Sequence, residues 1–89
     1  MAREADQIAQ DHSAMLGSVS VINSVIATHN KGSDATDEDF GHDMTHDEKK
    51  ARVTRSNGYL VHMKALEDWG SESFTEIDAA ISAANSFTA

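Results

Sequence analysis

The sequence predicts an all-α protein, an antiparallel helical hairpin of two long helices with a short C-terminal third helix. Three observations predict this fold class. Apolar residues recur three and four positions apart in three segments, two of these segments open with capping-box patterns, and glycine follows the first two. With 89 residues, the chain is expected to form a single domain over residues 1–89. A domain this small has a thin core, and without cysteine it lacks disulfides, so oligomerisation is the common remaining means of stabilisation.

The first helix is expected over residues 4–30, ending before Gly32. Its stretch 13–28 contains no charged side chain, whereas the outer face of a surface helix normally carries charge. We therefore predict that several sides of this helix are covered and that the protein oligomerises through it. The predicted oligomer interface comprises apolar residues at helical spacing: Ile8, Met15, Val19, Ile22, Val25 and Ile26.

The same stretch could instead form a strand. Residues 18–21 alternate serine and valine, and β-branched residues, which suit strands, are frequent there. Gly17 would also cost a helix about 1 kcal/mol relative to alanine. The helix is favoured because the three-and-four spacing persists over three heptads, while the alternation ends at Val21 and Ile22.

Small residues lie on another side of this predicted helix. Ser13, Gly17, Ser20 and Ser24 recur at the same helical spacing as the apolar residues. Small side chains so placed let a second backbone approach closely, a rule best established for helices in membranes.

A polar, acidic loop is expected over residues 33–44, followed by a second helix over residues 46–69. Thr45 and Glu48 match a capping box, which places the start of this helix. Its apolar residues continue to Trp69, and Gly70 would end it. Asn57-Gly58 is a turn signal in its middle, so we expect one helix that can kink there, with two short helices as the alternative.

The third helix is expected over residues 74–86. Ser73 and Glu76 match a second capping box. The apolar residues at helical spacing are Phe74, Ile77, Ala80, Ile81, Ala84 and Phe87. The two long helices should return antiparallel, with the third folding across an end or reaching to a neighbouring copy.

Composition excludes several classes of protein. A net charge of −8 and a pI of about 4.8 argue against nucleic-acid binding, which normally requires a basic surface. The uncharged stretch is shorter than the roughly 20 apolar residues of a membrane span and contains serine and threonine. Acids at Glu4 and Asp6 are unlike a secretory signal. We expect a soluble protein of the cytoplasm or of a virion, without contact to a membrane.

Histidine and aspartate pairs mark a candidate metal site. His42-Asp43 and His46-Asp47 repeat four residues apart, and their side chains are suitable ligands for Zn²⁺, Ni²⁺ or Cu²⁺. The capping box, however, places His46 inside the helix and His42 outside it, and a third ligand is not defined. The alternative is a solvated acidic loop, and no cofactor is expected.

Three further histidines lie at apolar positions or beside them. His12 and His29 are on the apolar side of the first helix, and His62 is at the edge of the apolar side of the second. Histidines at such positions are usually packing or boundary residues. The alternative is that they make a pH-sensitive contact.

Charges are segregated along the chain. Seven acids and no Lys or Arg lie in residues 34–48, and a basic stretch, 49–64, follows without an acid. The predicted charged contact patch is Lys49, Lys50, Arg52 and Arg55, of which Arg52 could also pair with Glu48 one turn earlier. Net charge favours the acidic loop of an adjacent copy over phosphate as its partner, and such complementary charges mainly set orientation and register.

No nucleophile motif, phosphate-binding loop or carboxylate on an apolar face is present, so we do not expect an enzyme. The function predicted is that of a small acidic homo-oligomeric structural or assembly protein. It would be a ring, adaptor or decoration subunit of a larger particle, a phage virion included, and would contact itself and other proteins of that particle. The first alternative is a regulatory module that contacts nucleic acid or an acidic partner through residues 49–64. The second is a metal-binding protein that uses the His/Asp loop.

Overall fold

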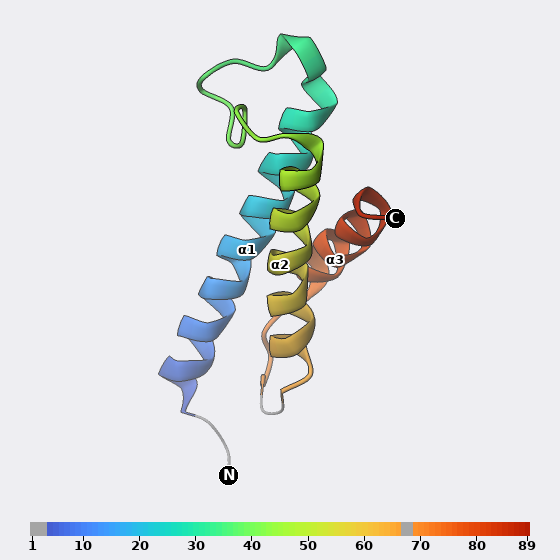
Figure 1. Cartoon of the computed structure of the whole chain (residues 1–89). Helices are drawn as coiled ribbons and strands as arrows, with labels where there is room; N and C mark the ends of the chain where they lie inside the picture. Colours follow the sequence, from blue (N-terminus) through green and yellow to red (C-terminus); the bar gives the residue numbers. More distant parts are fainter. Residues whose placement is uncertain (1–3, 67–68) are drawn as a thin grey trace.

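The computed structural model describes residues 4–66 and 69–89 of the chain, and within them all regular structure is helical (Figure 1). Helix α1 spans Ala5–Lys31 and continues into a short 3₁₀ helix, η1, at Gly32–Asp34. Helix α2 spans His46–Lys64, and helix α3 spans Thr75–Phe87. The all-α prediction is therefore confirmed. Helices α1 and α2 run antiparallel, the 35–45 loop joins them at one end, and α3 packs obliquely against both.

Helix α1 is continuous through the stretch for which a strand was the alternative. Its four-and-three spacing places Met15, Val19, Ile22 and Val25 on one buried side. Gly32 follows the helix with a φ of 57°, a conformation that costs glycine little, and its N–H bonds to the carbonyl of His29. The local pattern thus decides both the type of element and its end.

The capping box predicted at the start of α2 is confirmed. The Glu48 N–H donates to Thr45 Oγ1 at 3.1 Å, and the Thr45 N–H donates to Glu48 Oε1 at 2.9 Å. The bonds from Thr45 lower the pKa of the Glu48 carboxyl because they favour its ionised form. Helix α2 then passes through Asn57-Gly58 without a break, and Asn57 Nδ2 donates to Asn85 Oδ1 of α3 at 2.9 Å.

One expected helix boundary is wrong. Helix α2 ends at Lys64, and its expected last residue, Trp69, lies outside it. The indole is 8% exposed because it folds back into the core, where Nε1 donates to the carbonyl of Met63 at 3.1 Å. The indole therefore packs against the last turn of α2 and does not extend the helix.

The second capping box does not form. The residue that precedes α3 is Phe74, and it makes no side-chain cap bond within the described part of the chain. Ser73 Oγ instead accepts from the nearer Thr75 N–H at 3.4 Å. The Phe74 ring meets the Trp69 ring edge-on with 5.5 Å between centroids, so aromatic packing fixes the backbone at this entry.

The core lies where the three helices meet. Its fully buried large side chains come from all of them: Met15, Ile22, Val25, Val53, Leu60 and Ile77. Ala80 and Ala84 are also buried and let α3 approach the hairpin closely. Each buried Val, Leu, Ile or Met side chain contributes about 1.5–3 kcal/mol. Among the described helices, none combines the length and apolarity needed to cross a membrane.

Candidate functional site

Most residues of the predicted oligomer interface are buried inside one molecule. Met15, Val19, Ile22 and Val25 belong to the core formed with α2 and α3. Ile8 and Ile26 are partly buried at the edge of this core. The apolar side of α1 is thus covered within one molecule, and another side of the helix faces solvent.

The solvent-facing side of α1 carries no charge over four turns. Its exposed residues are Ser13, Ala14, Gly17, Ser20, Asn23 and Ala27. An exposed helix face normally carries charged side chains, and this chain has 25% charged residues from which to supply them. An uncharged face of small residues is the kind of surface on which another helix or loop can pack at short range.

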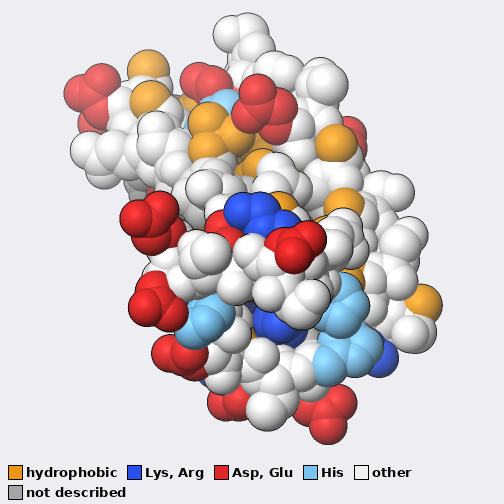
Figure 2. Space-filling model, turned by 90° about the horizontal axis from the view of Figure 1, so that it is seen from above, with side chains coloured by type: hydrophobic (Ala, Val, Ile, Leu, Met, Phe, Trp, Pro, Cys, Tyr) orange, Lys and Arg blue, Asp and Glu red, His pale blue; other side chains and the backbone are white. Residues whose placement is uncertain are grey.

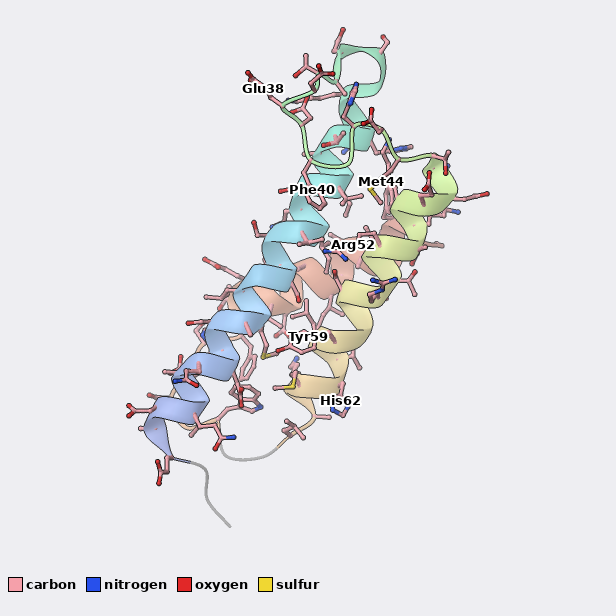
Figure 3. All side chains as sticks on the ribbon, turned by 60° about the vertical axis from the view of Figure 1, so that its left-hand side comes forward. Glu38, Phe40, Met44, Arg52, Tyr59 and His62 are labelled. Carbon is pink, nitrogen blue, oxygen red and sulfur yellow. The ribbon has the colours of Figure 1, made fainter. Side chains whose placement is uncertain are left out.

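A shallow groove of about 370 Å³ borders this face between α1 and α2. The residues that line it are Ala14, Gly17, Ser18 and Val21 of α1, and Arg52, Arg55, Ser56 and Tyr59 of α2. Figure 3 shows Arg52 and Tyr59 between the two helices, with α3 behind them. A Cβ added to Gly17 would meet no described atom within 4 Å, so this glycine leaves space open in the groove.

Two arginines give the groove its charge. Neither Arg52 nor Arg55 makes an ion pair with any residue in the described ranges 4–66 and 69–89. Arg52 Nε is shielded from solvent and lacks a hydrogen-bond acceptor among those residues. The expected pair with Glu48 is not formed, because the Glu48 carboxylate closes the capping box. Two unpaired guanidinium groups in an acidic chain suit a carboxylate or another anion.

The predicted charged contact patch is divided over different sides of α2. Arg52 and Arg55 line the groove, whereas Lys49 lies near His29 of α1, where its charge lowers the pKa of that histidine. Lys50 lies two residues before Arg52, which is about 200° around the helix. The groove therefore presents two of the four predicted bases.

The acidic loop is held in a defined shape. Thr28 Oγ1 donates to the carbonyl of Phe40 at 2.7 Å, and Lys31 Nζ donates to Asp39 Oδ1 at 2.6 Å. The bond from Lys31, supported by one from the Thr36 N–H, lowers the pKa of the Asp39 carboxyl. Gly41 has a φ of 78° and lies against Met44, where a Cβ would come within 3.0 Å of the sulfur.

Most acids of the loop point into solvent. The side chains of Asp37 and Asp43 are 98% and 94% exposed, and Glu38 is exposed as well. Figure 2 looks onto this end of the molecule and shows Asp and Glu side chains around it. One end of the hairpin is therefore an anionic tip on an anchored loop.

The four candidate metal ligands do not converge. His42 Nδ1 lies 2.8 Å from Asp43 Oδ1, and His42 Nε2 lies 3.5 Å from Asp37 Oδ1. His46 stacks on His29 instead, with 4.5 Å between ring centroids, while Asp47 is exposed on the first turn of α2. Within the described residues, no group of three or more His, Asp or Glu side chains gathers in a way that could hold a metal ion.

The sequence did not reveal the aromatic cluster at the same end of the bundle. Phe87 of α3 meets the rings of His29 and His46 edge-on, at centroid distances of 5.1 and 5.8 Å. Partial burial lowers the pKa of His29, and the nearby His46 and Lys49 lower it further. The helical spacing placed His29 beside the apolar residues of α1. The residues that it contacts belong to α2 and α3, so the spacing within α1 could not identify them.

A second histidine joins α1 to the segment before α3. His12 Nε2 lies 2.7 Å from the carbonyl oxygen of Ser73, and Nδ1 lies 3.4 Å from Glu72 Oε2. His12 and His29 are thus both packed between elements, one near each end of α1.

No family model, no curated protein and no solved structure matches this chain. Any function therefore has to be argued from the groove, the tip and the packing described above.

Proposed function

We propose that this protein is a homo-oligomeric assembly component whose copies associate through the open face of α1 and α2. The observation that carries the proposal is the groove beside the uncharged side of α1, where Arg52 and Arg55 are without an ion-pair partner among the described residues. The role we propose is that of a ring or adaptor subunit in a larger particle.

The shape of this face supports a protein partner. Gly17 and Ala14 allow close approach of another backbone, and Val21 and Tyr59 offer apolar surface that a partner would remove from water. Tyr59 is 36% exposed, and such partly exposed aromatic side chains are frequent anchors in protein interfaces.

The charges favour a second copy over nucleic acid. A nucleic-acid surface requires several bases on one face, and the groove presents two in a chain of net charge −8. The anionic tip would repel phosphate, whereas it complements the arginines of another copy.

Substitution of Gly17 tests the proposal, with Gly58 as a matched control. Both glycines lie inside long helices, and a Cβ at either meets no described atom within 4 Å. Gly17→Leu fills the groove, whereas Gly58 does not line it. We expect the unmodified chain and Gly58→Leu to have a native mass well above the 9.6 kDa of a single chain, and Gly17→Leu to shift toward that single-chain mass.

Native mass spectrometry and light scattering over a range of concentrations provide the measurement. A monomer for the unmodified chain at every concentration would refute the proposal. So would unchanged association of Gly17→Leu, because the groove would then lie outside the contact.

A further inference from the structure

We infer that the contact between copies is head-to-tail, with the anionic tip of one hairpin (Asp37, Glu38 and Asp43) seated in the α1/α2 groove of the next. This inference rests on the proposed function and specifies the partner of the same groove. Two observations support it. One molecule carries an anionic surface and a cationic surface at different places, and a symmetric contact through the groove would bring like charges together.

The tip and the groove lie on separate parts of the hairpin. The groove includes Gly17 and Arg55, which fall near the middle of α1 and α2, whereas the tip belongs to the loop at one end (Figure 1). The molecule measures 49 × 26 × 18 Å, so the loop lies toward one end of an elongated body. One copy can therefore offer its tip to one neighbour and its groove to another.

A two-fold contact centred on the groove is disfavoured by charge. It would bring Arg52 and Arg55 of both copies together, four guanidinium groups in one buried space. Like charges that meet across an interface oppose association, whereas guanidinium and carboxylate groups form strong paired hydrogen bonds. A carboxylate from the tip would also provide an acceptor for Arg52 Nε, which has none among the described residues.

The tip is suited to enter another molecule. Asp39 is engaged by Lys31 and Thr36, whereas Asp37, Glu38 and Asp43 are exposed. Asp37 and Asp43 also lie beside the ring of His42, which leaves their outer oxygens open to solvent. The bond from Thr28 to the Phe40 carbonyl already restrains the loop backbone, so less backbone entropy is lost on binding than for a free loop. Phe40 is 47% exposed beside these acids and supplies an apolar side chain to the same contact.

A head-to-tail contact uses different surfaces on the two partners. Repetition of such a contact produces a closed ring where the rotation closes and a filament where it does not. Each contact buries one tip and one groove, so an open assembly of any length keeps one free tip at one end and one free groove at the other.

Two charge-reversed variants test this arrangement. The groove variant is Arg52→Glu with Arg55→Glu, and the tip variant is Asp37→Arg with Glu38→Arg. In each variant alone, the tip and the groove have charges of the same sign, so we expect association to weaken by about a hundredfold or more. In an equimolar mixture, each contact between unlike variants again joins opposite charges, so the mixture should associate where each variant alone does not, with both variants present in equal amounts.

A control variant separates this effect from a change in net charge. Glu4→Arg with Asp6→Arg changes the charge by the same amount as the tip variant, at the opposite end of α1 on exposed side chains. We expect this variant to associate like the unmodified chain. Circular dichroism of each variant verifies that its helices are retained.

The outcomes distinguish the two proposals. If the unmodified chain remains monomeric, the proposed function fails. If it associates and the tip variant associates equally well, the function stands and the head-to-tail contact is refuted. Failure of the mixture to assemble, while both variants remain helical, would also overturn the head-to-tail contact.

Discussion

Thr28 illustrates how one side chain connects a helix to the acidic loop. Its hydroxyl lies 2.9 Å from the carbonyl of Ser24 within α1 and 2.7 Å from the carbonyl of Phe40. A hydroxyl has a single proton, so the shorter contact is the better hydrogen bond. Thr28 is 3% exposed, and a buried hydroxyl without a partner would be costly. Thr28 therefore holds the acidic loop against α1.

His29 should make stability depend on pH. Burial, His46 and Lys49 lower its folded pKa below the ordinary 6.5, so an unfolded chain binds the proton more readily. The resulting stability is present above about pH 6.5 and is lost as the pH falls through the lowered pKa. We expect the unfolding free energy to decrease from about pH 7.5 to about pH 5.5 by more in the unmodified chain than in His29→Gln.

Urea denaturation at both pH values measures this difference. His62→Gln is the control, since His62 is an exposed residue of α2. An equal pH response in the unmodified chain and His29→Gln would contradict the assignment to His29.

At the scale of the elements, two glycines affect the hairpin in opposite ways. Gly41 has a positive φ and lies against Met44, so it shapes the loop. Gly58 lies inside α2, where glycine is less favourable than alanine and a Cβ has open space. One glycine is thus required by its conformation, and the other weakens its helix.

Alanine substitutions should separate these roles. Gly58→Ala is expected to raise the unfolding free energy by about 0.5–1 kcal/mol, because alanine has less conformational freedom to lose. Gly41→Ala should lower it, because alanine is strained at a φ of 78° and its Cβ would press on Met44. Chemical denaturation measures both changes. A loss of stability in Gly58→Ala would show that α2 needs flexibility at this position.

At the scale of the whole molecule, two electrostatic effects oppose one another. Each copy carries a net charge of −8, so copies repel over long distances. The proposed contact between tip and groove attracts at short range, and exposed charges at its rim are screened by salt. The salt dependence of association reports which effect dominates.

We expect association to weaken as salt is raised. The Debye length decreases from about 10 Å at 0.1 M to about 3 Å at 1 M, so attraction at the rim of the contact is largely screened. Arg52→Leu with Arg55→Leu should remove most of this dependence, because the apolar surface is retained. Sedimentation at several salt concentrations provides the association constants. Tighter association at high salt would indicate instead that repulsion between whole molecules dominates.

The sequence by itself determined the class of fold and the start of α2. The spacing of Met15, Val19 and Ile22 and the capping box of Thr45 and Glu48 involve residues within a turn of one another. Interactions at such short separations depend mainly on the local sequence, so many of them can be derived from the order of residues. The second capping box is the exception, because the packing of Phe74 on Trp69 prevails there. The acidic loop was predicted from its polar composition between two helical patterns.

Only the tertiary structure decided which surfaces remain open. The predicted interface residues of α1 face α2 and α3, Trp69 packs beyond the end of its helix, and His46 meets His29 across the loop. Arg52 and Arg55 became a candidate site because α3 packs on another side of the hairpin. These contacts join residues far apart in the chain, and helical spacing gives the direction of a side chain without specifying which helix will cover it.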